Sequence, residues 1–267
     1  MPKRNVITNK NTFNNVLKDI PTYVINLATR KDKRKKVSTH LRRREINHKF
    51  YKATLHENPK RGCLESHLTL IREAIEKNVP YVMLMEDDVK FVHSPRHLDV
   101  PPEDWHMVYF GGTIHRVIGP DGETKSVVPE HKPGSIPQFR YHRVQCWTTH
   151  CYILNLTDPA FVEALLKMDD YEEEVDKFYL QNNHPNFNAY VVDPMIAIQQ
   201  DGFSDIEGRE VNYDFMQTSL YGLREPEHYK DDDGNYVLKM YDIADEDLPP
   251  VTIITPTYRR KTLFEIA

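Results

Sequence analysis

The stretch that decides the fold is "YVMLMEDDVKF", residues 81–91. The apolar run from Tyr81 to Met85 is typical of a buried strand, and it leads directly into Glu86, Asp87 and Asp88. Adjacent carboxylates repel one another, and each resists leaving water. Three of them at the end of a buried strand require an opposite charge, and we expect a bound cation to supply it.

Strand and helix patterns alternate on both sides of this stretch. Apolar, β-branched and aromatic runs predict strands at 21–27, 48–54, 80–89 and 105–112. A basic helix is expected from Lys31 to Arg44, and a second helix over 61–78, where leucine and isoleucine recur at helical spacing. This alternation predicts an α/β fold with a mainly parallel central sheet and flanking helices.

The second half of the chain has less regular patterns. Residues 113–140 are rich in Gly, Pro and charge, and they predict a loop or a small hairpin. Further elements are expected as a strand at 149–155, a helix at 158–168, a short helix at 172–182, a strand at 188–200 and an exit loop at 201–208. Asp158 is the expected N-cap of the first of these helices, with Pro159 at its first helical position.

Composition divides the chain into four parts. Residues 1–19 form an N-terminal extension, 20–221 the α/β domain and 222–250 an acidic linker. The last part, "VTIITPTYRRKTLFEIA" at 251–267, has the pattern of a buried strand, a turn and the start of a helix. We expect it to begin a second α/β domain that is cut short. The alternative is that its strand pairs with the first domain.

The overall composition is that of a globular protein. The chain has 267 residues, a net charge of −5, 39% hydrophobic residues and 28% charged residues. No apolar run approaches the roughly 18 residues of a membrane span, and the N-terminus lacks the apolar core of a secretory signal. Three cysteines without CxxC spacing favour a reduced, cytoplasmic setting.

Charge is distributed unevenly along the chain. Residues 1–60 hold sixteen Lys and Arg against four Asp and Glu, whereas residues 201–250 hold fourteen acids against four bases. The basic part is suited to a nucleotide diphosphate or nucleic acid, or it is simply a solvated helix face. The acidic net charge and the lack of interleaved aromatic and basic residues argue against nucleic acid.

The position of the acids suggests their chemistry. Ligands of open α/β sheets bind at the carboxyl ends of the strands, where Glu86, Asp87 and Asp88 are expected. Hard oxygen ligands there favour Mn²⁺ or Mg²⁺ shared with phosphates, although such a triplet is also common as a helix N-cap or a solvated turn. Asn26 is suited to reading a nucleobase at the end of the first strand, and Arg30 and Arg34 to holding a phosphate.

One pair of residues has the spacing of zinc ligands on a helix. Cys63 and His67 are four residues apart, but no second pair completes such a site, so we do not expect zinc there. For His67, a buried structural role and a role facing the ligand both stay open.

Several blocks together resemble a known family. They are "VINLATRKDKRKK", "RGCLESHLTLIREAIEKNVPYVMLMEDDV", "VYFGG", "TTHCYILN", "VDKFYLQN" and "PMIAIQQDGFSDI". In order and spacing, from about residue 20 to 206, they resemble glycosyltransferase family 25. That family includes bacterial lipopolysaccharide and lipooligosaccharide β-galactosyltransferases and animal procollagen galactosyltransferases.

The resemblance implies a GT-A-like fold, with a Rossmann-like nucleotide-binding half, and an inverting transfer of galactose or glucose. It implies a UDP-sugar donor, Mn²⁺ or Mg²⁺ as cofactor, and a hydroxyl of a glycan, a protein-linked sugar or a hydroxylysine as acceptor. The residues it implies for the donor are Asn26, Leu27, Arg30, Arg34, Ser66, His67, Glu86 and Ser204. Those it implies for the metal are Glu86, Asp87, Asp88 and Asp205.

An inverting transfer also needs a general base on the acceptor hydroxyl. Asp176 matches the family's "V-D" element and is the first candidate, with Glu174 as the second. Alternatively, these acids only favour the positive end of a helix. Trp147 either stacks on an acceptor sugar or is buried.

The chain departs from the family pattern in two places. Ala28 and Thr29 intervene before Arg30, and Pro59 to Gly62 replace a Gly-Glu-x-Gly loop, so that Lys60 or Arg61 either contacts phosphate or is exposed. The tail at 251–267 resembles the opening strand of a family 2 glycosyltransferase. The other functions considered are a non-catalytic nucleotide-sugar binding module and a Mg²⁺-dependent nucleotidyl- or phosphotransferase. No Walker loop is present, which argues against the common NTPase form.

Overall fold

The fold is described from a computed structural model covering residues 17, 19–95, 98–119, 122 and 139–213. The expected acidic linker at 222–250 and second domain at 251–267 lie outside these residues, as does almost all of the expected N-terminal extension. Within the described residues, no helix combines the length and apolarity that crossing a membrane requires.

The first half of the chain alternates strands and helices as the sequence predicts. The elements are β1 (Thr22–Asn26), α2 (Lys31–Arg43), β2 (Lys49–Lys52), α3 (Pro59–Glu76) and β3 (Tyr81–Glu86). Both β2 and β3 pair with β1 in parallel, so β1 lies between them. The chain therefore leaves β1 toward one side of the sheet and then crosses back over to the other side.

The central sheet has eight described strands in the order β2-β1-β3-β8-β5-β9-β7-β6. The remaining members are β5 (Met107–Tyr109), β6 (Thr113–Val117), β7 (Arg140–Trp147), β8 (Cys151–Asn155) and β9 (Ala189–Asp193). The pairings of β8 and β7 with their neighbours are antiparallel. Because only these two strands run against the others, the mainly parallel α/β sheet expected from the sequence is confirmed.

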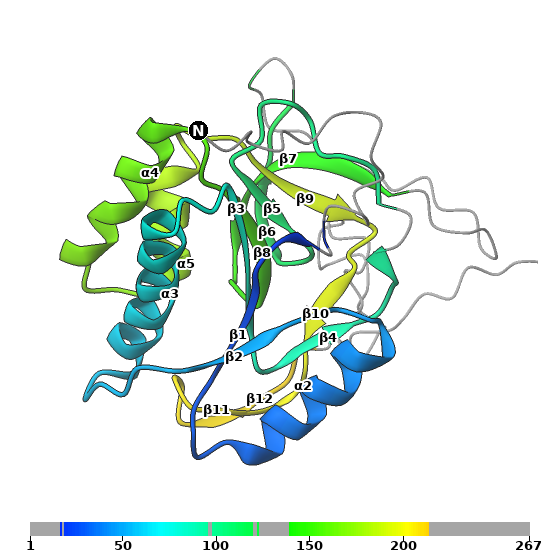
Figure 1. Cartoon of the computed structure of the whole chain (residues 1–267), viewed down its shortest axis with the longest axis vertical. Coiled ribbons are helices and arrows are strands. Elements are labelled where there is room, and N and C mark those ends of the chain that lie inside the picture. The colour runs from blue at the N-terminus through cyan, green and yellow to red at the C-terminus, as the bar shows by residue number, and fades with distance from the viewer. Residues whose placement is uncertain (1–16, 18, 96–97, 120–121, 123–138, 214–267) are drawn as a thin grey trace, which may run out of the picture.

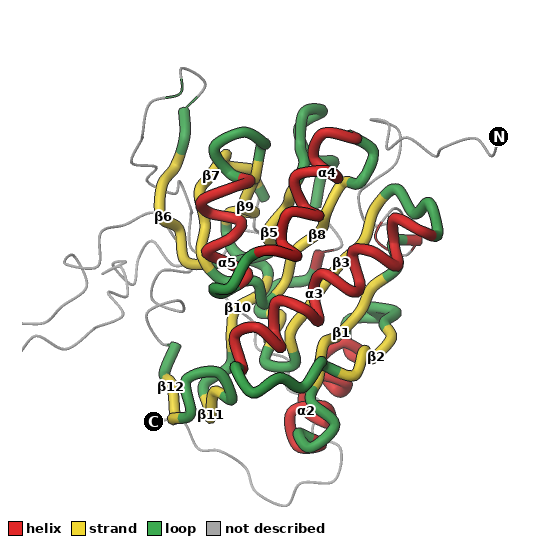
Figure 2. The backbone as a smooth tube through the Cα atoms, turned by 90° about the vertical axis from the view of Figure 1, so that its left-hand side faces the viewer, coloured by secondary structure: helices red, strands yellow, loops and turns green. Residues whose placement is uncertain are grey.

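Helices cover both faces of this sheet. Figures 1 and 2 show α3, α4 (Pro159–Leu166) and α5 (Val175–Phe178) on one face, while α2 lies on the opposite face. Two buried clusters match these layers. One contains Leu64, Leu68 and Ile71 of α3, and the other contains Val37 and Leu41 of α2. The apolar stripes of the helices thus bury both faces of the central strands, which explains why β3, β5 and β8 are mainly apolar.

Two helix starts follow from capping. Asp158 accepts a 2.9 Å hydrogen bond from the backbone N–H of Ala160 and caps α4, with Pro159 in the first turn, as predicted. Helix α3 begins at Pro59, two residues before the expected start. Asn58 caps it by accepting from the backbone N–H of Lys60, so the departure at 59–62 is the first helical turn and not a loop.

Three segments of the second half differ from the elements expected from the sequence. Strand β7 was not predicted, because "RYHRVQCW" is too polar to read as buried. It pairs antiparallel with β6, while residues 120–121 and 123–138, most of the region expected to be a loop or a small hairpin, lie outside the described residues. The expected exit loop is a second hairpin, formed by β11 (Gly202–Ser204) and β12 (Arg209–Val211). The expected short helix at 172–182 consists of α5 followed by a π-helical turn, η3 (Tyr179–Asn183).

Short strands complete the carboxyl edge of the sheet. The expected strand at 188–200 is interrupted at the cis Asp193–Pro194 bond, and its second part, β10 (Ala197–Gln199), pairs with β4 (Val89–Phe91). The Gly-Gly after β5 permits this crossing, because a Cβ at Gly111 would collide with the backbone carbonyl of Ala197. The segment after the acids is therefore held against the segment before the β11–β12 hairpin.

Candidate active site

The candidate site lies where the strand order reverses, at the carboxyl ends of β1 and β3. Asn26 is the last residue of β1 and is only 3% exposed. Its Nδ2 donates to Oδ2 of Asp87 at 2.6 Å and to the carbonyl of Arg30 at 3.1 Å. The two strand ends are thus joined directly, and the amide N–H groups of Asn26 are engaged within the protein.

Arg30 connects the turn after β1 to the β11–β12 hairpin. Its guanidinium donates two hydrogen bonds to Asp32, at 3.0 and 3.1 Å, and its Nη1 lies 2.5 Å from Oδ2 of Asp205. The hydrogen bond and charge of Arg30 hold the pKa of the Asp32 carboxyl well below its ordinary value. The hairpin that carries Ser204 and Asp205 is therefore fixed beside the first turn of α2.

Lys33 is a site residue that the sequence analysis did not single out. Its Nζ lies 3.5 Å from Oδ1 of Asp87 and 3.6 Å from Oδ2 of Asp205. Its signal in the sequence is its place three residues after Arg30, since the N-cap and the third residue of a helix lie close together at the start of that helix. Part of the charge required by the acids is therefore provided by the protein itself.

A cavity of about 300 Å³ opens at this point. Its walls combine cations with carboxylates, and its lining includes Arg30, Lys33, Lys36, Asp87, Asp88 and Ser204. Arg34 is not among the lining residues, because its guanidinium lies 4.1 Å from the centre of the Phe50 ring on β2. A mixed lining of this kind is suited to a phosphate group that is bound together with a cation.

Glu86 and Asp88 hold protons more tightly than ordinary carboxyls. Burial and the negative charge of Asp88 raise the pKa of Glu86 to about 8. Burial also raises the pKa of Asp88 to about 6, although Lys33 opposes this shift. Thr149 stabilises Glu86 by donating a 2.7 Å hydrogen bond to its Oε1. A nearby cation would offset both burial and repulsion, because it favours the charged form of each carboxyl.

Asp88 provides a direct test of whether a divalent cation fits. Its Oδ1 is buried and has no hydrogen-bond partner among the described residues. An unpartnered carboxylate oxygen is costly unless a cation or a proton satisfies it. Asp87 and Asp88 both line the cavity and offer carboxylate oxygens, so the residues present fit Mn²⁺ or Mg²⁺, which prefer such ligands.

The two candidate bases have opposite environments. Asp176 accepts hydrogen bonds from the backbone N–H groups of Lys177 at 2.8 Å and Thr148 at 3.3 Å, and burial raises its pKa. Partial burial also acts to raise the pKa of Glu174, but hydrogen bonds from Lys177 and Lys60 outweigh it and hold that pKa at about 2. Asp176 is therefore the more basic carboxylate. Its negative charge also contributes to the raised pKa of Glu86.

Ser66 and His67 lie behind the acids, inside α3, and both are 0% exposed. The hydroxyl of Ser66 donates to the carbonyl of Gly62 at 2.7 Å and accepts from the backbone N–H of Thr54 at 2.8 Å. The imidazole of His67 bonds to the hydroxyl of Tyr152. Neither side chain lines the cavity, so both support the site from within the core.

The other predicted residues lie at the margins. The carbonyl of Leu27 accepts from the N–H of Arg30 in the turn after β1. The hydroxyl of Ser204 accepts from the N–H of Glu207 in the hairpin. Trp147, at the end of β7, is half-buried and lies edge-on to His115. The contacts expected between Leu27 or Ser204 and the sugar donor, and between Trp147 and an acceptor sugar, therefore stay predictions.

Comparison with known proteins was made for both sequence and structure. Residues 54–99 match glycosyltransferase family 25 (LPS biosynthesis protein). This segment contains α3, β3 and the three acids, and it confirms the resemblance seen in the sequence. The match supports a glycosyltransferase enzyme that takes a sugar donor and a glycan acceptor. No curated protein matches the chain in sequence.

Three solved structures are similar to this chain over part of its length. A glycosyltransferase involved in the glycosylation of the major capsid of PBCV-1 is 12% identical, with a TM-score of 0.44, covering 70% of this chain and 95% of that one. The protein A197 from STIV is 10% identical, with a TM-score of 0.35 and coverages of 72% and 93%. The nucleoside-diphosphate-sugar pyrophosphorylase from Vibrio cholerae RC9 is 17% identical, with a TM-score of 0.30 and coverages of 67% and 75%. Because all three TM-scores are below 0.5, these similarities do not bear on the function of this chain.

Proposed function

We propose that this chain transfers a hexose, galactose or glucose, from a UDP-sugar to a hydroxyl of a glycan or a glycosylated protein, with inversion at the anomeric carbon. The observation that carries the proposal is the cavity at the ends of β1 and β3, where Asp87 and Asp88 face Arg30 and Lys33. A nucleotide diphosphate with a divalent cation satisfies both sets of charges at once. The free thiols of all three cysteines favour a reduced, cytoplasmic setting.

Asp87 and Asp88 would hold Mn²⁺ or Mg²⁺, with Glu86 and Asp205 beside them. When bound, this ion supplies the positive charge that stabilises the departing diphosphate. Lys33 and Arg30 add fixed positive charge on the same side of the cavity. Arg30 forms short hydrogen bonds with its two carboxylates, whereas Lys33 lies 3.5 and 3.6 Å from Asp87 and Asp205, so we expect Lys33 to contact a phosphate oxygen.

Asp176 is the proposed general base. It removes the proton from the acceptor hydroxyl while that oxygen forms its bond to the anomeric carbon and the bond to the diphosphate breaks. A raised pKa makes its carboxylate a better proton acceptor than Glu174, which is neutralised by two lysines. The backbone N–H groups of Thr148 and Lys177 keep the carboxylate of Asp176 in place before the acceptor arrives.

UDP release from a panel of UDP-sugars, with and without Mn²⁺, tests this proposal. We expect Mn²⁺-dependent release from a UDP-hexose, and a decrease of at least about 100-fold in Asp88→Asn, in line with the loss of an electrostatic catalytic group. Asp169→Asn is the matched control, because Asp169 is exposed and pairs with Arg72 away from the cavity.

Calorimetry with UDP distinguishes the other outcomes. UDP binding without turnover on any donor or acceptor would identify a non-catalytic nucleotide-sugar binding module. Release of pyrophosphate in place of UDP would identify a nucleotidyltransferase. The absence of both UDP binding and turnover would refute the proposed function.

A further inference from the structure

We propose that Cys63, His67 and Glu86 form a second metal site, which binds Zn²⁺ behind the acids that face the cavity. It would take an ion of a different chemical class from the Mn²⁺ or Mg²⁺ proposed for Asp87 and Asp88. The inference goes beyond the proposed function and does not depend on it.

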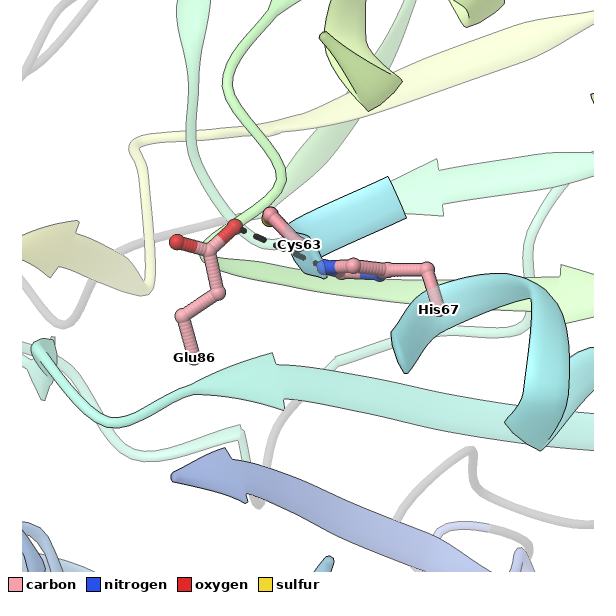
Figure 3. Close-up of side chains that lie close together, drawn as sticks. All are labelled: Cys63, His67 and Glu86. Carbon is pink, nitrogen blue, oxygen red and sulfur yellow. Dashed lines mark ion pairs between the residues drawn. The ribbon is translucent and has the colours of Figure 1, made fainter. Parts of the chain in front are cut away.

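The three side chains converge from two elements. Cys63 and His67 lie one turn apart on α3, and Glu86 ends β3. One ligand atom from each, the thiol sulfur, a ring nitrogen and a carboxylate oxygen, lies within 4.8 Å of the other two. Figure 3 shows the His67 ring pointing toward the Glu86 carboxyl, with Cys63 beside them, and Nε2 of His67 lies 3.8 Å from Oε1 of Glu86.

His67 is held in the orientation of a metal ligand. Its Nδ1 lies 2.7 Å from the hydroxyl of Tyr152, which lies 3.0 Å from the hydroxyl of Tyr179. Metal-binding histidines usually have their second ring nitrogen fixed by such a partner. A ring that donates from Nδ1 to Tyr152 presents the lone pair of Nε2 toward Cys63 and Glu86.

The free nitrogen is the observation that points to a ligand. Nε2 of His67 is fully buried and has no hydrogen-bond partner among the described residues. The 3.8 Å to Glu86 is too long for a hydrogen bond, and a buried polar atom without a partner is costly. A cation between Nε2, the thiolate of Cys63 and the carboxylate of Glu86 satisfies all three groups.

The donor set selects the metal. A thiolate, an imidazole and a carboxylate suit Zn²⁺, whereas Mn²⁺ and Mg²⁺ prefer oxygen alone. Zinc bonds of about 2.0–2.3 Å place tetrahedral ligand atoms about 3.3–3.6 Å apart, so side-chain movements of about 1 Å close the site. Three protein ligands leave the fourth position open, and the 2.7 Å hydrogen bond from Thr149 holds Oε1 of Glu86, the oxygen that lies 3.8 Å from Nε2 of His67.

Titration of the metal-free chain with Co²⁺, followed by displacement with Zn²⁺, tests the site. Co²⁺ bound by a thiolate gives a near-ultraviolet charge-transfer band, which oxygen-only sites do not give. We expect one equivalent of Co²⁺ to produce the band and Zn²⁺ to remove it. Cys63→Ala should abolish the band and weaken Co²⁺ binding by more than about 100-fold, beyond the 10- to 100-fold loss typical of outer partners.

Two controls make the result specific. Cys151→Ala also replaces a cysteine by alanine, but in the buried cluster that packs against α2 on the opposite face of the sheet. This variant should keep both the charge-transfer band and the Co²⁺ affinity. Asp88→Asn should also keep the band, since Asp88 belongs to the proposed oxygen site. Circular dichroism reports whether each variant is folded. His67→Gln removes a second ligand of the proposed site and tests it independently of Cys63.

Tyr152→Phe tests the positioning of His67. It leaves all three ligands in place and removes only the hydroxyl at Nδ1, so Co²⁺ affinity should fall about 10- to 100-fold while the thiolate band persists. A wild-type chain without a charge-transfer band, or a folded Cys63→Ala or His67→Gln variant that binds Co²⁺ as tightly as wild type, would overturn the inference. Because no readout is transferase activity, failure of the proposed function leaves this test intact.

Discussion

Nδ2 of Asn26 lies 2.6 Å from Oδ2 of Asp87, 61 positions later in the chain, and this contact joins the carboxyl ends of the parallel strands β1 and β3. It gives one carboxylate of the acidic run a neutral donor, while Lys33 gives it a charged one. Burial raises the pKa of all three acids, and the pKa values of Glu86 and Asp88 reach about 8 and about 6.

Substitution of Asn26 by aspartate should destabilise the fold. Asn26→Asp replaces a donor by a fourth carboxylate next to Asp87, so we expect a loss of about 1–3 kcal/mol in the free energy of unfolding, measured by urea denaturation. Asn188→Asp is the matched control, because Asn188 also donates to a carboxylate, Asp104, but at an exposed position where solvent screens the charge. Equal losses in both variants would contradict this account of the strand ends.

The assignment of Asp176 as the general base predicts that substitutions of Asp176 and Glu174 affect kcat differently. Asp176→Asn should lower kcat by about 10²–10⁴-fold, because it removes the group that takes the acceptor proton. The affinity for UDP, measured by calorimetry, should stay within a few-fold of wild type. Glu174→Gln should retain most activity, since that carboxylate is paired with Lys60 and Lys177. A larger loss of kcat in Glu174→Gln would reverse the assignment.

Lys33 should contribute to donor binding. Lys33→Gln removes the cation between Asp87 and Asp205, and we expect UDP affinity in the presence of Mn²⁺ to fall about tenfold, which corresponds to about 1.4 kcal/mol. Lys77→Gln is the matched control, because Lys77 is exposed and pairs with Glu73 on the far end of α3. Unchanged UDP affinity in Lys33→Gln would remove Lys33 from the site.

Buried His184 should make the fold sensitive to acid. Burial lowers its pKa from 6.5 to about 3, and its Nδ1 accepts from the backbone N–H of Cys146 while Nε2 contacts the hydroxyl of Tyr109. Between these two pKa values the unfolded chain binds a proton that the native chain does not, so stability falls as the pH falls through this range. The contribution is at most about 1.4 kcal/mol per pH unit.

Urea denaturation between pH 7 and pH 4 measures this effect. His184→Gln should reduce the slope of unfolding free energy against pH, whereas the same change at exposed His115 should leave the slope as in wild type. A slope that is unchanged in a folded His184→Gln variant would refute the role of His184.

Gly111 should tolerate no side chain. A Cβ there meets the carbonyl of Ala197, which is backbone and cannot swing aside. Gly111→Ala should therefore reduce stability by about 2 kcal/mol or more and shift the β10 segment that passes over the acids. The midpoint of thermal unfolding gives the size of the loss, and a midpoint within 2 °C of wild type would show that the crossing relaxes freely.

The sequence by itself determined the order of the main elements and the edge where the site lies. An apolar run such as Tyr81 to Met85 favours a buried strand, and the carboxyl ends of parallel strands meet at one edge of a sheet. This is why Asn26 and the acids could be placed together before any contact was known. Local signals also sufficed for the cap at Asp158, since an N-cap depends only on its own turn.

Only the tertiary structure decided which side chains meet across the sheet. Strand β7 is polar in sequence and becomes a member of the sheet because β6 and β9 lie on either side of it. Arg34 faces Phe50 and Lys33 faces the cavity, a difference of one helical position that composition does not reveal. Likewise, Cys63 and His67 lacked a third ligand in the sequence, and β3 brings Glu86 to them. Such contacts depend on long-range packing between elements, which no local pattern encodes.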